Sequence, residues 1–265
     1  MVLDFKIRSF ADLTDKKNLI NLKLIIEYDG KNYFGWQRQK FKPSIQGTIE
    51  KSLQVIFPRE KINLVGAGRT DAGVHALNQV ANFKLNKVVL NSKGIDKLRY
   101  SLNSILPDDT SIKKINVAKD SFNSRYSAVN RVYRYILCID KRGFNHDKCY
   151  QIKTKFDIDL AKEFCKLVEG VHSFKSLCKN SADKHNFLCD VKYAKVTKDK
   201  DNLIKFEICA SRFLHSMVRA IVGAMVKAAS GRLSINEFKT KFEKGEKIKI
   251  QYVPANALIL VKVNY

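Results

Sequence analysis

Strand-like and helix-like segments alternate along the whole chain, and this mixture most constrains the fold. The segments LKLIIEY (22–28) and QVANFKL (79–85) interleave apolar and polar residues, which is typical of half-buried strands. Between them, residues 44–56 follow Pro43 and carry apolar side chains at helical spacing. No Pro-, Gly- or Ser-rich linker interrupts the pattern. The sequence therefore predicts an α+β protein of two similar halves, each with a mainly antiparallel sheet and flanking helices.

We expect three parts along the chain: an N-terminal extension at 1–20, a first half at 21–143 and a second half at 144–265. The strongest helix signal, SRFLHSMVRAIVGAMVKAAS (211–230), carries an apolar stripe and ends before Gly231. Further helices are expected at 98–106, 157–169 and 234–244, and further strands at 62–66, 111–117, in the second half of 122–139, near 190–197, at 203–210 and at 257–263.

The charge of the chain indicates a polyanionic partner. The chain has 49 Lys and Arg residues but only 26 Asp and Glu residues, which gives a formal net charge of +23. A coding bias can explain why lysine outnumbers arginine, but it does not by itself explain this imbalance. Nucleic acid is the favoured partner, and an anionic membrane surface is the smaller alternative. The longest apolar runs are far shorter than a membrane helix, and the first residues do not resemble a signal peptide, so we expect a cytoplasmic protein.

The cysteines leave a metal site open but do not favour it. None of the six forms a CxxC pair, and disulfides are rare in an intracellular chain. His172, Cys178, His185 and Cys189 lie close in sequence, yet their spacing fits no standard zinc finger. Buried free thiols are the simpler interpretation. From these residues we do not expect a metal site.

The stretch GAGRTDAGVHA (66–76) is the most unusual segment of the chain and allows three interpretations. A phosphate-binding loop is disfavoured because Asp71 would repel the ligand and the GxGxxG spacing is not met. A plain connecting loop fits the many turn residues. A catalytic loop fits as well, because an Asp beside the cation of Arg69 can stay ionised and act as a nucleophile. In that loop His75 is an acid or base, or more simply a packing group.

Five segments of the chain together resemble the tRNA pseudouridine synthase A family. GAGRTDAGVHA resembles its catalytic motif, and RFLHSMVRAIVG (212–223) resembles its C-terminal helix motif. The other three are YDGKNYFGWQRQ (28–39), SIQGTIEKSL (44–53) and FNSRYSAVNRVYRY (122–135), and all follow in the order of the family. The resemblance covers nearly the whole chain from about residue 21.

The resemblance implies an isomerase that converts uridine to pseudouridine at positions 38, 39 and 40 of the tRNA anticodon arm. It implies that Asp71 is the catalytic nucleophile, that Arg69 pairs with it and that Tyr133 contacts the flipped target base. It also implies a homodimer that binds tRNA in basic clefts and uses no metal or cofactor. From the residues alone, the spacing favours Tyr133 as a strand residue that packs its sheet, and the resemblance reverses this preference.

Six other residues are candidates for binding the substrate. Their side chains are basic or aromatic and lie within the resembling segments: Trp36, Arg38, Arg125, Arg212, His215 and Arg219. For Trp36 a packed aromatic anchor is an equal alternative, and for the three residues on 212–219 a solvated helix face is another. The rival hypotheses are a non-catalytic RNA-binding protein or RNA chaperone, and a metal-dependent nucleic-acid enzyme built on the Cys and His cluster.

Overall fold

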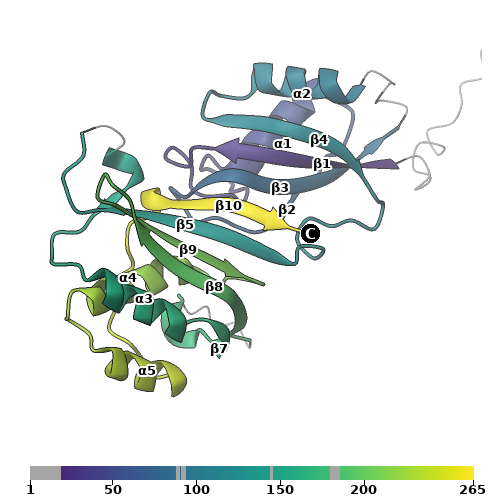
Figure 1. Ribbon diagram of the computed structural model, residues 1–265. Helices are drawn as coiled ribbons and strands as arrows, with labels where there is room; N and C mark the ends of the chain where they lie inside the picture. The colour runs from purple at the N-terminus through teal and green to yellow at the C-terminus, as the bar shows by residue number, and fades with distance from the viewer. Residues whose placement is uncertain (1–18, 88–89, 91–93, 144–145, 180–185) are drawn as a thin grey trace, which may run out of the picture.

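The computed structural model describes residues 19–87, 90, 94–143, 146–179 and 186–265, and the account below refers to them. Within them, one continuous sheet of ten strands runs the length of the molecule (Figure 1). Its main path is β4-β1-β3-β10-β5-β9-β8-β7, with β2 beside β3 and β6 beside β5. The strands are β1 Leu19–Tyr28, β2 Val65–Gly66, β3 His75–Asn86, β4 Thr110–Ala118, β5 Asn130–Cys138, β6 Tyr150–Gln151, β7 Gly170–Ser173, β8 Leu188–Lys198, β9 Leu203–Ala210 and β10 Leu258–Asn264.

The C-terminal strand β10 lies inside the sheet and joins strands β4, β1 and β3 on one side to strands β5, β9, β8 and β7 on the other. It pairs in parallel with β3 at Ile259 and Leu260, and it pairs antiparallel with β5 on its other side. The remaining neighbours on the main path are antiparallel, so the predicted α+β class with a mainly antiparallel sheet is confirmed. The two expected sheets are thus parts of one sheet. The division at residue 144 stays a prediction.

Helices lie at both ends of this sheet (Figure 1). The helices are α1 Ile45–Ile56, α2 Gly94–Ile105, α3 Ile158–Leu167, α4 Met217–Ala229 and α5 Ile235–Glu243. Three of them begin where the sequence offers a capping side chain, because the oxygens of Ser44, Asp157 and Ser234 accept hydrogen bonds from the first turn. The expected helices at 44–56, 98–106, 157–169 and 234–244 are therefore confirmed to within a few residues.

The expected start of the helix at residue 211 is wrong, since α4 begins only at Met217. Residues 211–216 form an irregular segment instead, and Ser216 adopts a left-handed conformation with φ 56°. Tertiary contacts take carbonyl groups that a helix would use: the Ser211 carbonyl accepts from Arg131 Nη1, and the His215 carbonyl accepts from the Lys179 N–H. This irregular segment brings polar side chains over the glycine-rich motif.

Candidate active site

The motif loop, residues 66–76, connects β2 to β3 through a tight turn. The Val74 N–H donates to the Asp71 carbonyl at 3.2 Å, and Gly73 takes the positive φ of 78° that this turn requires. A second glycine, Gly35, lets a neighbouring loop approach, since a Cβ there would lie 2.6 Å from the Thr70 carbonyl oxygen. The motif is therefore a rigid turn that presents the side chain of Asp71.

The carboxylate of Asp71 meets the start of α4. Its Oδ2 accepts a hydrogen bond from Ser216 Oγ at 2.8 Å and lies 3.4 Å from Arg219 Nη1. Its Oδ1 lies 3.7 Å from His215 Nε2. The positive end of the helix dipole lies at the same place. These groups stabilise the negative charge of Asp71, while 24% of the side chain stays open to an incoming group.

The predicted pairing of Arg69 with Asp71 is wrong in this structure. The Nε of Arg69 donates instead to Gln37 Oε1 at 3.0 Å, and its side chain is exposed. Among the described residues, Arg219 is the arginine paired with Asp71. Arg219 suits this role because its Nε donates to the Val253 carbonyl at 2.8 Å. A side chain held in this way loses less conformational entropy on pairing than an exposed one.

Tyr133 of β5 lies close enough to Asp71 for the charge of the carboxylate to act on its phenol. Its ring is buried, and it packs edge-on against Phe213 with 5.0 Å between the ring centroids. Burial raises the pKa of the Tyr133 phenol well above its ordinary value, and the charges of Tyr28 and Asp71 raise it further. The charge of Arg131 acts in the opposite direction and lowers this pKa. The site thus combines a carboxylate with a phenol that keeps its proton.

Arg131 is a residue that the sequence interpretation missed. Its Nη1 donates to the carbonyls of Ala128 and Ser211, and its Nη2 donates to those of Ala67 and Arg125, at 2.8 to 3.2 Å. One guanidinium therefore ties the motif loop to two other segments of the site. The available signal was its position on the same strand, two residues before Tyr133.

His75 acts as a packing group in this arrangement. Its buried ring accepts the Gly30 N–H on Nδ1 at 3.1 Å, and its Nε2 lies 2.9 Å from the Asn256 carbonyl oxygen. The Asp29 carboxylate also lies 2.9 Å from Nδ1. Through the contacts with Gly30 and Asn256, the ring fastens the end of the motif to two neighbouring loops.

The comparisons with known proteins decide the family. The model of the family described as tRNA pseudouridine synthase matches residues 24–127 and 164–265, which include Asp71, Ser216 and Arg219. The chain belongs to the tRNA pseudouridine synthase family. Its members convert uridine to pseudouridine, so the chain is an isomerase that acts on tRNA. Tyr133 and Arg131 lie between the two matched ranges.

Relatives named tRNA pseudouridine synthase A resemble the chain along almost all of its length. The protein of Thermodesulfovibrio yellowstonii is 39% identical over 93% of this chain and 100% of its own length. The protein of Dictyoglomus turgidum is 40% identical over the same shares. A solved Cbf5-Nop10-Gar1 complex matches at a TM-score of 0.35 and 13% identity, over 77% of this chain and 44% of the matched one. The family membership favours the enzyme over the non-catalytic alternative.

The substrate-binding candidates of this tRNA pseudouridine synthase occupy different places. His215 and Arg219 lie at Asp71, as described above, and Arg125 and Arg212 are exposed. Arg38 forms an ion pair with Glu50 at 2.7 Å and stays more than half exposed. Trp36 is only 2% exposed, so the prediction that it stacks on RNA is wrong. Its ring packs over Gly66, where a Cβ would lie 2.5 Å from it, and it is an aromatic anchor beneath the motif loop.

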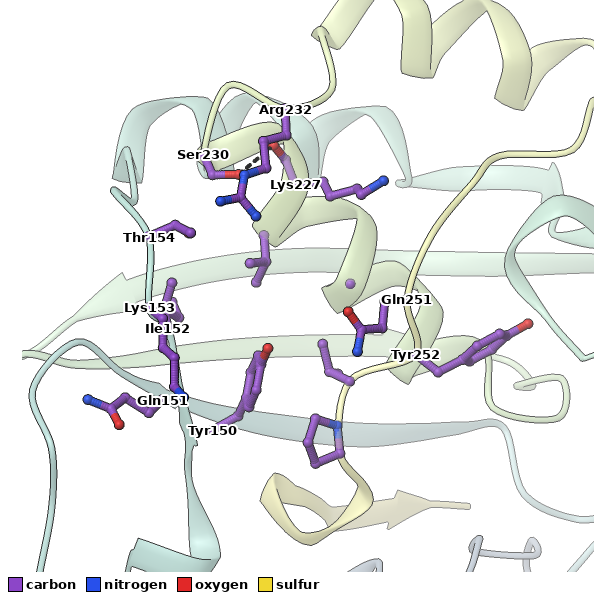
Figure 2. A pocket seen from close by; sticks show the side chains of 14 residues that line it. Tyr150, Gln151, Ile152, Lys153, Thr154, Lys227, Ser230, Arg232, Gln251 and Tyr252 are labelled. Atoms are coloured by element: carbon purple, nitrogen blue, oxygen red, sulfur yellow. Dashed lines mark hydrogen bonds between the residues drawn. The ribbon is translucent and has the colours of Figure 1, made fainter.

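A hollow of about 460 Å³ lies beyond Arg219 along α4 (Figure 2). Tyr150, Arg232 and Gln251 point into it from β6, from the residues after α4 and from the segment before β10. None of Asp71, Tyr133 and Ser216 lines it. It touches the site only through Val253, whose carbonyl holds Arg219, and it is therefore separate from the reacting centre.

The predicted Cys and His cluster was tested only in part. His185 lies outside the described residues. Within them, no group of three or more His, Cys, Asp or Glu side chains is placed to hold a metal ion. None of the described helices combines the length and hydropathy needed to span a membrane.

Proposed function

We propose that this enzyme isomerises uridines 38, 39 and 40 of the tRNA anticodon arm and that Asp71 is its nucleophile. The observation that supports this most is the position of Asp71 on a rigid turn, held by Ser216 and Arg219 yet 24% exposed. A fixed, ionised and accessible carboxylate is what covalent catalysis by aspartate needs. The motif around it also resembles the catalytic motif of the family.

The reaction conserves all atoms. The glycosidic bond between C1′ and N1 breaks, the uracil turns, and a bond forms between C1′ and C5; the proton of C5 leaves, and N1 gains one. Asp71 can attack C1′ of the ribose or C6 of the base, and in either route it leaves again at the end. No oxidant, reductant or energy source is consumed, which agrees with a site made of a carboxylate and a phenol.

The target uridine must leave its stack to reach Asp71, so we include base flipping in the proposal. The ring of Tyr133 is suited to contact the flipped uracil, because burial and Phe213 hold it in place. Arg69 is exposed at the surface of the motif loop and is held by Gln37. We propose that the Arg69 side chain fills the space that the flipped base leaves in the RNA.

Tyr133→Phe is expected to lower kcat by roughly 10²- to 10⁴-fold, the usual contribution of a positioned acid or base. The raised pKa of Tyr133 keeps its phenol protonated through neutral and mildly alkaline pH, so the phenol is a weak acid on its own, and its hydroxyl can act there by relaying a proton, giving up one as it takes up another. Single-turnover rates measure the effect, and Tyr193→Phe, a phenol on β8 outside the site, is the control. A wild-type rate for Tyr133→Phe contradicts the proton-transfer role and leaves only ring packing.

The experiment that tests the proposed function is pseudouridine mapping of tRNA incubated with the protein. We expect new pseudouridines at positions 38, 39 and 40, and binding that weakens steeply with salt because of the charge of +23. Modification elsewhere refutes the substrate assignment. Binding without any modification supports the non-catalytic alternative. We also propose a cytoplasmic homodimer, and sedimentation of the full chain at the mass of a monomer contradicts the dimer.

A further inference from the structure

Three exposed aromatic side chains lie beside a cation near the motif loop. The exposed fractions are 46% for Phe34, 87% for Phe41 and 79% for Tyr126. The cations lie over these rings: Lys42 Nζ is 4.5 Å from the Phe34 centroid, Lys40 Nζ is 5.1 Å from that of Phe41, and Arg125 Cζ is 5.5 Å from that of Tyr126. Burial does not explain these aromatic positions, because each ring faces solvent.

The segments that carry these pairs are bound directly to the motif loop. Residues 34–42 reach it through the Trp36 N–H, which donates to the Thr70 carbonyl at 3.1 Å, and through the bond between Arg69 and Gln37. Arg125 is attached on another side, since Arg131 Nη2 donates to the carbonyls of Arg125 and Ala67, both at 2.8 Å. The three pairs therefore border the loop that carries the nucleophile.

Local hydrogen bonds hold both segments in fixed turns. In the first, the Phe34 N–H donates to the Pro43 carbonyl at 2.9 Å, and Gln39 Nε2 donates to the Phe34 carbonyl at 2.8 Å. In the second, Asn123 Oδ1 accepts from the N–H groups of Arg125 and Tyr126 at 2.9 and 3.2 Å. Because the turns are fixed before a ligand arrives, binding to the rings costs less ordering entropy.

An exposed ring with a cation beside it is the usual contact for an unpaired nucleotide. The base stacks on the ring and the cation meets the phosphate, whereas a duplex hides its base faces. We propose that Phe34, Phe41 and Tyr126 stack on unpaired nucleotides of the anticodon loop of the tRNA substrate, near the target uridine. Lys40, Lys42 and Arg125 bind the adjoining phosphates. This inference rests on the proposed function, since it names what surrounds the reacting uridine.

The test compares single-stranded RNA with an RNA duplex of the same length, bound to Asp71→Asn protein so that no reaction occurs. Phe34→Ala, Phe41→Ala and Tyr126→Ala are each expected to weaken single-strand binding about 5- to 150-fold, the range for one lost base stack. Duplex binding is expected to stay within about twofold. Tyr100→Ala on α2 is the matched control, because Tyr100 is 75% exposed and distant in sequence from both segments.

Two results overturn the inference. One is an equal loss on single strand and duplex, which indicates a general electrostatic contact. The other is an equally large loss for Tyr100→Ala. Circular dichroism and melting curves establish that each variant is folded. The difference between single-strand and duplex binding is measured without catalysis. A mapping experiment that finds no pseudouridine therefore contradicts the proposed function without deciding the stacking inference. An unchanged kcat/KM in the triple alanine variant sinks the stacking inference and leaves the proposed function standing.

Discussion

Replacing Asp71 by asparagine is expected to lower the rate of pseudouridine formation by roughly 10⁴-fold or more. An amide is a far weaker nucleophile than a carboxylate, and removal of a nucleophile from other enzymes costs rate factors of this size. Asparagine matches aspartate in shape, and its carbonyl oxygen can still accept the hydrogen bond from Ser216. We therefore expect the turn to persist and tRNA binding to stay within a few-fold, as measured by single-turnover kinetics and a binding titration.

The matched control is Asp159→Asn, which removes the same charge from α3. Its side chain is 83% exposed and pairs only with Lys162 three residues later, so we expect neither rate nor stability to change measurably. If Asp71→Asn keeps its rate within tenfold of the wild type, Asp71 is not the nucleophile. The same holds if the two variants lose activity equally, because the effect then follows from charge alone.

The elements with strong periodicity were predictable, and the start of α4 was not. The helix 44–56 was found because Pro43 and the apolar spacing after it agree, and the structure adds Ser44 as its cap. At residues 211–216 the apolar spacing continues, but contacts to Arg131 and Lys179 take carbonyl groups that a helix would have used. Sequence periodicity contains no information about such long-range partners.

The nucleophile candidate could be predicted, while its pairing partners could not: Arg219 and His215 were expected to bind the substrate, and Ser216 was not named. Asp71 stands in a local motif, but Ser216 lies 145 residues further along and Arg219 lies 148 residues further. Ser216 is at the position where a serine normally caps a helix, yet here its hydroxyl serves Asp71. Arg69 was the natural choice because it is two residues away, and sequence proximity was the wrong guide to pairing.

Trp36 was misplaced for a related reason. It alternates in the sequence with Phe34 and with basic residues, and nothing local shows which ring faces outward. The structure buries Trp36 over Gly66 and leaves Phe34 exposed. A glycine 30 positions away decides this, because its missing side chain leaves the space that the indole ring fills.

Replacing Arg131 by methionine is expected to lower the free energy of unfolding by about 3–5 kcal/mol. The change removes the donors of four hydrogen bonds and leaves the carbonyls of Ala67, Arg125, Ala128 and Ser211 without this partner. Methionine fills much of the volume, so the loss reports the hydrogen bonds more than a cavity. Urea denaturation measures it, and a fall in Tm of roughly 10 °C is expected for a chain of this size.

The control lies on the same strand. Arg134→Met removes an ion pair to Glu207 at 2.8 Å, but Glu207 keeps contacts with Lys195 and Tyr193, so the cost is expected to be about 1 kcal/mol or less. If the two variants unfold alike, Arg131 does not have the special role that its four contacts indicate.

Kinetics measured below the melting temperatures of the wild type and of Arg131→Met separate two effects of the substitution, one on the position of the motif loop and one on the stability of the fold. Because Arg131 holds Ala67 at the start of the motif loop, we expect Arg131→Met to lower kcat at least tenfold with little change in KM. Arg131→Lys keeps the charge but cannot reach four carbonyls in the same geometry. We therefore expect its kcat to lie between that of the wild type and that of Arg131→Met. A destabilised Arg131→Met with wild-type kcat shows that the motif loop holds Asp71 in place without this arginine.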